Sequence, residues 1–468
     1  MRNEDFTVVL VNPPATGLVQ SELSTAVPRH EGLMPPLGLL YLAAALRREV
    51  GCRLRLLDAP AEGLDEVGTL EAITRERADL VGLSVLTSNL VAAASLARAL
   101  RTLHPRLPCC LGGPHVTHFP EETLQLPGVD YVVEGEGEQV LVDLVRMLLA
   151  DEPRQRPRTP GERRLVGRPV ENLDDLPFPS RDLLPSASYS MLLARGRRPT
   201  TLLASRGCPY HCTFCSTPRG PYRRRSIASL LAELRHCRDA GYDEFHFLDD
   251  TFNADPGFVT DFCTALLDEH LRLRWSFRGR VGQLEDRHFE LLRRAGCVRI
   301  HFGVEASSKQ ALASLGKGIE LAAIRRTFAL ARQHRVRTVG YFLLGCPTDR
   351  TPADLAATVK FALALRPDYA LFNVLVLYPG SRLHDRAVER GLLDPEHWRR
   401  FARSPRQDFL PPYWPEWFDR SRLEAMRRQA NRRFYLRPGY LATALLRPEN
   451  YRALPQRLLA LRELVVRG

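Results

Sequence analysis

The chain has 468 residues, of which 44% are hydrophobic and 26% are charged. This length exceeds that of one hydrophobic core, so we expect two large domains, and the composition excludes an intrinsically disordered protein. No apolar run approaches the ~20 residues that span a membrane, and the opening "MRNEDFTVVLVNPP" has no signal-peptide pattern. We therefore expect a cytoplasmic protein, in which clustered cysteines bind metals or act in catalysis rather than form disulfides.

The net charge of +12 comes mainly from arginine, because lysine occurs only at Lys309, Lys317 and Lys360. The arginines are spread along the chain and do not gather with aromatic residues in one basic patch, as they would in a nucleic-acid-binding protein. We interpret them as solvated surface, and we expect a monomer with no membrane span and no nucleic-acid partner.

The first 150 residues alternate apolar strands with helical stretches. The strand-like runs are "FTVVLVNPP", "RLRLLDAP", "LVGLSVL", "PCCLGGP" and "VDYVVEG". Helical spacing separates them, as in Leu39, Leu42, Ala43 and Leu46 on one face. Five such units predict an α/β domain over residues 1–150. We expect a doubly wound, flavodoxin- or Rossmann-like parallel sheet, with its ligand site at the carboxyl ends of the strands.

The composition changes after this domain. Residues 151–196 are polar and rich in proline, which indicates a linker followed by a strap. A second alternation follows over residues 197–390, with six strand-like runs from "TTLLASRGC" to "YALFNVLVLYPG". Six βα units predict a partial (β/α)6 barrel, whose chemistry lies in the loops after the strands. We expect residues 391–468 to form a small helical tail.

Three cysteines lie close together in "RGCPYHCTFCSTP": Cys208, Cys212 and Cys215. A structural zinc site normally has four ligands, often in two C-x-x-C pairs. Here the spacing is C-x3-C-x2-C and no second pair completes it, although a zinc site or buried thiols are the alternatives. An iron–sulfur cubane held by three thiolates would leave one iron open for a further ligand.

This segment resembles the signature of the radical S-adenosylmethionine (SAM) superfamily, with Phe214 as the aromatic residue before the third cysteine. The resemblance implies that the cysteines bind a [4Fe–4S] cluster, and that SAM binds the fourth iron and is cleaved to a 5′-deoxyadenosyl radical. It also implies SAM contacts by Asp249 and Asp250 in "FLDDTFNAD" and by Glu305 and Ser307 in "HFGVEASS". The alternatives are a helix N-cap cluster for the aspartates and an ordinary strand end for the glutamate.

Two short motifs in the first domain resemble those of cobalamin-binding domains. "SVL" supplies Ser84 and Leu86 after the third strand, and "LGGP" supplies Gly112 and Gly113 after the fourth. The resemblance implies that these residues line a slot for the nucleotide tail of the cofactor. The alternative is a Rossmann-like domain without cobalamin, although the first turn lacks the G-x-G-x-x-G that binds dinucleotides.

The first cobalamin motif, D-x-H-x-x-G, is only partly kept in "NPPATG". Asn12 replaces the aspartate, Pro14 replaces the histidine that ligates cobalt, and Gly17 is retained. Together with the "MPPLGLLYLAAAL" and "VVEGEGE" segments, this is similar to cobalamin-dependent radical SAM proteins of the class B methyltransferase type. The resemblance implies cobalamin that has no histidine ligand on its lower face.

The resemblance therefore implies an enzyme with three cofactors: a [4Fe–4S] cluster, SAM and cobalamin. We expect methyl transfer through methylcobalamin to an unactivated centre of a small-molecule or biosynthetic-intermediate substrate, with electrons from a donor such as flavodoxin or ferredoxin. The alternatives are a cobalamin-dependent radical cyclase or rearrangement enzyme, and a non-catalytic corrinoid-binding protein. The intact cysteine triad counts against the last of these.

Overall fold

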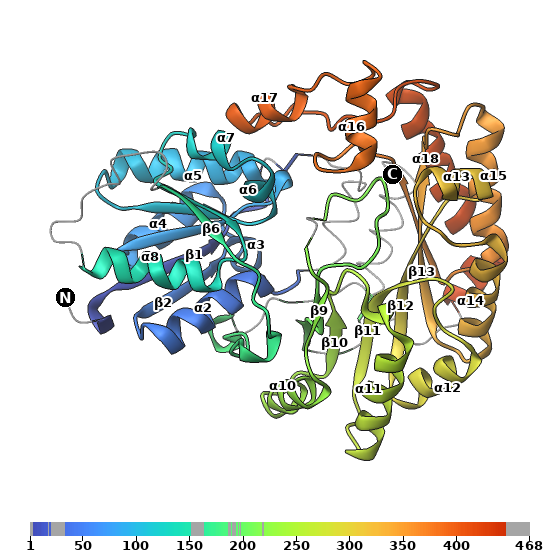
Figure 1. Cartoon of the computed structure of the whole chain (residues 1–468), viewed down its shortest axis with the longest axis horizontal. Helices are drawn as coiled ribbons and strands as arrows, with labels where there is room; N and C mark the ends of the chain where they lie inside the picture. The colour runs from blue at the N-terminus through green and yellow to red at the C-terminus, as the bar shows by residue number, and fades with distance from the viewer. Residues whose placement is uncertain are drawn as a thin grey trace. The chain divides into compact units, whose positions relative to one another are not determined.

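The computed structural model describes residues 3–16, 18–19, 33–150, 163–185, 189, 193–194, 196, 198–217 and 220–445. The chain folds into two compact units (Figure 1). The first comprises Met1–Ser21, Pro35–Ser188 and Pro395–Leu410, and the second comprises Glu22–Met34, Tyr189–Asp394 and Pro411–Gly468. No helix in the described part of the chain is both long and apolar enough to cross a membrane.

Six parallel strands form the sheet of the first unit, in the order β2-β1-β3-β4-β5-β6 among the described residues. The strands are β1 (Thr7–Asn12), β2 (Arg53–Asp58), β3 (Leu80–Ser84), β4 (Cys109–Gly112), β5 (Tyr131–Gly135) and β6 (Arg164–Gly167). The direction of the strand order reverses between β1 and β3, which is the topological switch point where such sheets bind their ligands. The doubly wound fold expected from the sequence is confirmed.

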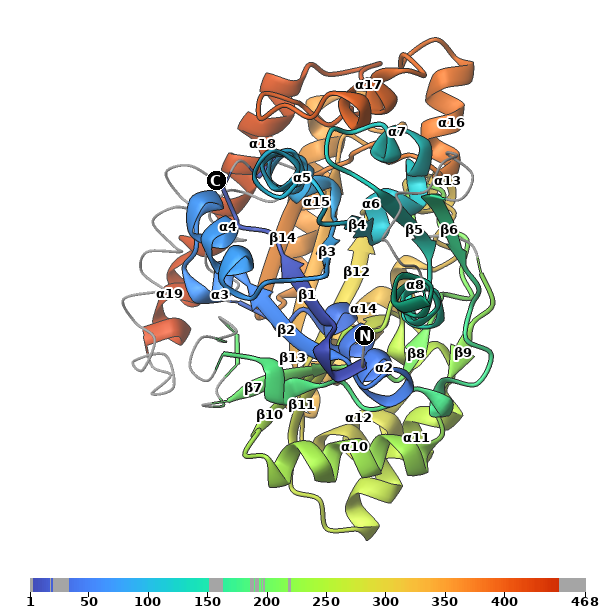
Figure 2. The ribbon, with the colours of Figure 1, turned by 90° about the vertical axis from the view of Figure 1, so that its left-hand side faces the viewer.

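Helices cover both faces of this sheet. Helices α2 (Leu37–Glu49) and α8 (Glu138–Ala150) pack together on one face, and α4 (Glu66–Arg75) and α5 (Leu90–Leu103) pack together on the other (Figure 2). Of the expected apolar stripe of α2, Leu39, Ala43 and Leu46 are buried, whereas Leu42 is half-buried. Three short helices complete the unit: α3 (Ala59–Glu62), α6 (Pro114–His118) and α7 (Pro120–Leu124).

The segment expected to be a linker contributes a strand. Strand β6 pairs in parallel with β5, and Arg164 forms an ion pair of 2.8 Å with Glu134 of that neighbour. The arginine-rich composition hid this strand because β6 lies at the edge of the sheet, where Val166 is 62% exposed and a polar sequence is tolerated. Residues 151–162 of the expected linker lie outside the described residues.

The second unit contains a six-stranded parallel sheet, in the order β14-β13-β12-β11-β10-β7 among the described residues. The strands are β7 (Pro199–Leu202), β10 (Glu244–Phe247), β11 (Arg274–Arg280), β12 (Cys297–Glu305), β13 (Arg337–Leu344) and β14 (Tyr369–Val374). The strands follow one another along the chain with helices between them, so the expected partial (β/α)6 barrel is confirmed.

The helices of the second unit lie against the outer face of its sheet (Figure 1). They are α10 (Ile227–Asp239), α11 (Pro256–Asp268), α12 (Asp286–Arg294), α13 (Lys309–Ser314), α14 (Leu321–Gln333) and α15 (Pro352–Leu365). Side-chain caps fix where several begin: Ser226 accepts a hydrogen bond at the start of α10, and Asp255 does so before the first residue of α11, Pro256. Buried aromatic residues such as Phe245, Trp275 and Phe302 fill the space under these helices.

The expected tail, residues 391–468, is divided between the two units. After α16 (Arg382–Glu389), helix α17 (His397–Arg403) joins the first unit, where Arg399 forms an ion pair of 2.5 Å with the buried Glu122 of α7. Helix α18 (Arg420–Tyr435), followed by α19 (Pro438–Leu445), packs on the second unit against β14 and α15. There the Tyr435 hydroxyl donates to the Ala370 carbonyl at 2.8 Å and accepts from the Ala370 amide at 3.2 Å, which satisfies the edge of β14.

Candidate cofactor sites

The three cysteines lie on one loop that is anchored to the barrel. The loop joins β8 (Ser205–Arg206) to β9 (Arg223–Arg224), and Gly207 opens it with a φ of +82°. A Cβ atom at this position would lie 2.8 Å from the Pro221 carbonyl oxygen, so only glycine fits without a shift. In the middle of the loop, Thr213 donates to the carbonyls of Leu315 and Ser314, each at 2.9 Å. The loop conformation is therefore set by the protein itself.

Each cysteine sulfur has a polar neighbour. Cys208 Sγ lies 3.5 Å from Thr251 Oγ1, Cys212 Sγ accepts from Arg280 Nη1 at 3.9 Å, and the exposed Cys215 lies against Thr217. The other cysteines are buried, and burial raises the pKa of Cys110 and of Cys297 to about 12, which keeps them protonated. Solvent access and polar neighbours therefore distinguish the triad as the thiols suited to bind metal.

No group of three His, Cys, Asp or Glu side chains among the described residues encloses a single metal ion. A cubane cluster does not require such a group, because its three thiolates bind three different irons. The donor set, three cysteines on one loop, fits a cluster.

The loop after β10 holds the cysteine loop in place. Asp249, expected to contact SAM, is buried and accepts hydrogen bonds from the Ala204 amide at 3.1 Å and from the Ser205 hydroxyl at 2.5 Å. Burial raises the pKa of Asp249 to about 6 in spite of these hydrogen bonds. Asp250 is exposed, and its carboxylate makes no hydrogen bond or ion pair with another described residue. Of the two aspartates, Asp250 is the one that could bind a ligand.

Sequence reasoning missed a cation beside the cysteines, Arg280. The buried Asn253 side chain fixes its backbone, accepting from the Arg280 amide at 2.7 Å and donating to its carbonyl at 2.8 Å. The guanidinium lies over the Tyr210 ring, 3.9 Å from the centroid, and donates to Cys212. Arg280 thus holds a positive charge beside a cluster ligand.

A second buried cation, Lys317, pairs with Glu305 at 2.9 Å. Glu305 has a φ of +71°, which is costly for a residue with a Cβ atom, and a side chain at Gly303 would lie 2.3 Å from its carboxylate. Lys317 Nζ also lies 5.8 Å from the centroid of Phe214 in the cysteine loop. The structure therefore brings Glu305 close to the cysteine loop, where Lys317 neutralises its charge. The Ser307 hydroxyl lies 3.2 Å from the Thr358 hydroxyl.

The residues expected to bind cobalamin lie at the carboxyl ends of adjacent strands in the first unit. Asn12 ends β1 and Ser84 ends β3, so these two border the switch point, and Gly112 ends β4, the next strand of the sheet. The Asn12 amide donates to Asp58 at 2.8 Å, while the apolar Leu86 is 48% exposed after β3. Gly17 lies outside the described residues.

The two glycines after β4 differ in what they require. Gly113 has a φ of +117°, and a Cβ atom there would lie 2.8 Å from the Val85 carbonyl oxygen. Gly112 is less restricted, because a Cβ atom would make an ordinary contact of 3.5 Å with Val133. The backbone geometry therefore requires glycine at position 113 but not at position 112.

Sequence reasoning missed a buried histidine that follows these glycines in "LGGPH". The His115 Nδ1 lies 3.0 Å from the Thr87 hydroxyl, and its Nε2 has no hydrogen-bond partner in the described part of the chain. Burial, aided by His118, lowers the pKa of His115 to about 3, so the ring is neutral. A buried polar atom without a partner costs about 1–3 kcal/mol, which a polar group of a bound cofactor would offset.

Comparison with known proteins adds to this geometry. Residues 25–145 match the family model of the B12 binding domain, and residues 202–362 match that of the radical SAM superfamily. An uncharacterized methyltransferase of Pyrococcus horikoshii is 31% identical over 450 residues, which cover 93% of this chain and 93% of that protein. The chain belongs to the cobalamin-dependent radical SAM methyltransferase family. Its cofactors are accordingly a [4Fe–4S] cluster, SAM and cobalamin.

Two further proteins are similar to this chain. An anaerobic magnesium-protoporphyrin IX monomethyl ester cyclase of Rubrivivax gelatinosus is 25% identical over 436 residues, covering 88% of this chain and 75% of that protein. The solved structure of TsrM, a radical S-adenosylmethionine methyltransferase of Kitasatospora setae, superimposes with a TM-score of 0.65 at 20% identity. That superposition covers 82% of this chain and 78% of TsrM, and shows a shared fold.

The first unit also fits the family's corrinoid. The strand ends at the switch point carry a small residue, Gly112, an exposed apolar residue, Leu86, and the unsatisfied Nε2 of His115. Pro14 is buried at the motif position of the cobalt-ligating histidine, and its ring offers no nitrogen that could ligate. These residues would hold the cofactor without supplying that ligand.

Proposed function

We propose that the protein transfers a methyl group to an unactivated centre of a small-molecule substrate. The observation that carries this proposal is the anchored loop of Cys208, Cys212 and Cys215, held by Thr213 and flanked by Arg280, in a chain that also has a B12 binding domain. A non-catalytic corrinoid carrier would not need such a loop.

When bound, the cofactors would supply the difficult chemistry, namely activation of an unactivated carbon and a methyl group to transfer. The protein positions them. Cys208, Cys212 and Cys215 would hold three irons, and Asn253 fixes the backbone of Arg280, whose guanidinium lies beside the Cys212 sulfur.

We assign the remaining cofactor contacts as follows. Asp250 binds the SAM amino group, because its carboxylate is exposed and uncommitted whereas that of Asp249 is not. Glu305 ends β12 and Ser307 follows it, and their place at the carboxyl end of a barrel strand supports their assignment to the SAM site. In the first unit, the cobalamin contacts come from the carboxyl strand ends, and the residues are Asn12, Ser84, Leu86, Gly112, Gly113 and His115.

The test is anaerobic reconstitution with iron, sulfide, hydroxocobalamin, SAM and a reductant. The expected products are 5′-deoxyadenosine and, with a competent substrate, S-adenosylhomocysteine and a product heavier by one CH2 unit. Cys212→Ala should abolish 5′-deoxyadenosine release, whereas Cys52→Ala, which removes a buried thiol from the other unit, should not. Wild-type protein that binds both cofactors but never cleaves SAM would refute the proposal.

Cyclisation without methyl transfer is the second candidate, because one relative is named as a cyclase. It predicts 5′-deoxyadenosine without S-adenosylhomocysteine and no gain in substrate mass. We further propose a monomer that receives electrons from flavodoxin or ferredoxin in the cytoplasm. The absence of disulfides among its ten cysteines, all of them described, supports a reducing compartment.

A further inference from the structure

The inner face of the barrel sheet is polar, unlike its outer face. Register pairs His246 with Ser276 and Arg278 with His301, so these side chains share one face of β10, β11 and β12. The neighbouring positions on the other face are aromatic or aliphatic and lie in the core. Barrel interiors that serve only as packing are filled by Val, Ile and Leu. A polar inner face therefore indicates a surface built for a ligand.

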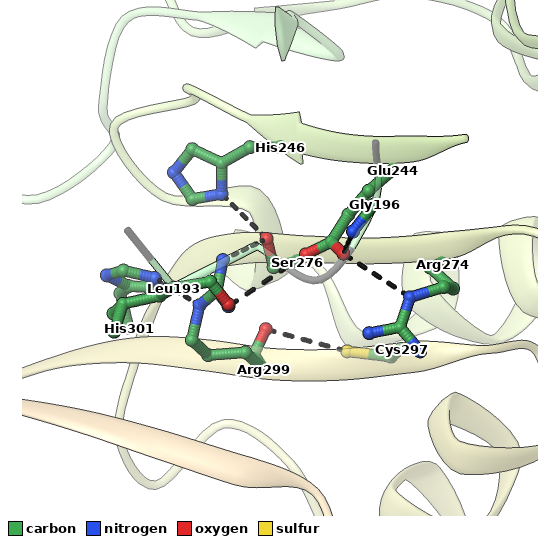
Figure 3. Close-up of polar contacts among 9 residues, drawn as sticks. All are labelled: Leu193, Gly196, Glu244, His246, Arg274, Ser276, Cys297, Arg299 and His301. Carbon is green, nitrogen blue, oxygen red and sulfur yellow. Dashed lines mark hydrogen bonds and ion pairs between the residues drawn. The ribbon is translucent and has the colours of Figure 1, made fainter. Parts of the chain in front are cut away.

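At the amino ends of the strands, this face carries one carboxylate between two arginines. Glu244 accepts from Arg274 at 3.3 Å and from the Gly196 amide at 2.9 Å, and it lies 4.0 Å from Arg299. Arg299 also donates to the Leu193 carbonyl at 2.5 Å. These groups hold one another in place and form the floor of the inner face (Figure 3).

Above this floor lies a layer of uncharged hydrogen-bonding groups. Arg299 donates to Ser276 at 3.2 Å and to His301 Nε2 at 3.0 Å, so the proton of His301 is on Nδ1, which faces the Tyr341 hydroxyl at 2.9 Å. His246 Nδ1 lies 2.9 Å from Ser276. Burial and the nearby arginines lower the pKa of both histidines well below its usual value, so both are neutral. In Figure 3 His301 lies on the side of Arg299 away from Glu244 and Arg274, and the Ser276 hydroxyl lies between Arg299 and His246.

Arg278 is the next residue of this face toward the carboxyl ends. It is exposed and makes no hydrogen bond, ion pair or ring contact with any described residue, although its charge acts on His246, His301 and Asp250. A guanidinium with all of its donors available, next to a rigid layer of neutral imidazoles, has the geometry and charge to bind two oxygens of one anion.

We propose that Arg278, with His246 and His301 beside it, binds an anionic oxygen group of the substrate, namely a phosphate, phosphonate or carboxylate. This inference rests on the proposed function, because it identifies the substrate class of the same barrel. The anion anchors the molecule on the inner face, while the uncharged end reaches the strand ends that carry the cofactor loops. Neutral histidines suit this role because they donate or accept hydrogen bonds without adding charge.

The test measures anion binding to the reconstituted holoprotein by anaerobic calorimetry, with methylphosphonate and acetate as separate probes. Wild type is expected to bind at least one probe, and the preferred probe tells a phosphorus oxyanion from a carboxylate. Arg278→Ala should weaken that binding about tenfold or more, because it removes a charge-assisted pair. Arg272→Ala removes an exposed arginine outside the sheet and should leave it unchanged.

Three results would overturn the inference: neither probe binds wild type, Arg278→Ala binds as wild type does, or Arg278→Ala loses affinity for SAM instead. The third would make Arg278 a SAM contact. Far-ultraviolet circular dichroism and cluster absorbance check folding. If Arg278→Ala fails them, Arg278→Gln and His246→Gln are measured in its place, with weaker anion binding expected for both. This assay needs no turnover, so its outcome is independent of catalysis. Loss of anion binding with normal SAM cleavage refutes this inference alone. Anion binding without SAM cleavage refutes the proposed function alone.

Discussion

Two strand-end sites in this protein are built by opposite means. In the barrel, charged and polar side chains surround the cysteine loop. Asp249 and Asn253 form hydrogen bonds with backbone groups. Arg280 donates to Cys212, and Lys317 forms an ion pair with Glu305. The site in the doubly wound sheet has small and apolar residues at its strand ends, and His115 Nε2 is a buried atom there with no hydrogen-bond partner among the described residues. A small cluster that changes charge needs fixed electrostatics, whereas a large corrinoid mainly needs room and a few hydrogen bonds.

The buried ion pair offers the largest test of this contrast. Lys317→Ala leaves the Glu305 carboxylate buried without its partner, and we expect it to lower the free energy of unfolding of the barrel by about 3–5 kcal/mol. Denaturant titration monitored by tryptophan fluorescence measures it. The double variant Glu305→Gln/Lys317→Met, which leaves no charge unpaired, should regain much of the loss. Equal losses in the single and double variants would contradict the electrostatic explanation.

The sequence predicted the two sheets because their strands are short apolar runs at regular intervals. It missed β6, where Arg164 pairs across to Glu134 in a polar edge strand, and it missed that α18 completes the barrel through Tyr435 and Ala370. The edge contact joins residues 65 positions apart, and no local pattern reports such a distance. The elements that the sequence predicted correctly are therefore those with a clear local pattern of apolar residues, and not those that depend on contacts between distant residues.

The same division applies to the cluster site. The cysteine triad is recognisable because its three members share one loop, so that spacing alone carries the information. Arg280 reaches Cys212 across 68 positions, and Asp249 and Asp250 are adjacent in sequence but differ in burial. Which aspartate supports the loop and which faces outward depends on the fold around them. Residue type indicated the chemistry, and only the structure separates supporting residues from exposed ones.

The histidine in the first unit allows a test by pH. Because the folded-state pKa of His115 is about 3 and the unfolded value is about 6.5, the unfolded state takes up the proton first as pH falls. The stability that this neutral histidine contributes is complete above pH 6.5 and is lost toward pH 3. Between pH 7 and pH 5 we expect a loss of about 2 kcal/mol in wild type that is absent in His115→Gln. Unfolding midpoints of the two proteins at both pH values measure this difference, and parallel behaviour would contradict it.

The charge beside the cluster has a smaller expected effect. Removing Arg280 favours the oxidised, more positive cluster, so Arg280→Ala should lower its reduction potential, by on the order of 50 mV. Electron paramagnetic resonance during a redox titration measures the shift. Arg280→Lys keeps the charge and should recover part of it. An unchanged potential in Arg280→Ala would show that the 3.9 Å contact with Cys212 has no electrostatic consequence.

The smallest expected change in stability is that of a substitution at Gly112, one of the two adjacent glycines after β4. Gly112→Ala adds a methyl group in ordinary contact with Val133, so we expect unfolding to change by less than about 0.5 kcal/mol. Gly113→Ala should cost about 1–3 kcal/mol, because it combines a positive φ with a clash against the Val85 carbonyl. If the strand end is a corrinoid slot, Gly112→Ala nevertheless weakens hydroxocobalamin binding, read from its absorbance spectrum. If Gly112→Ala leaves both stability and cobalamin affinity unchanged, the cofactor does not bind at this strand end. The open strand ends of the first unit could then not be contrasted, as a corrinoid site, with the charged cluster site of the barrel.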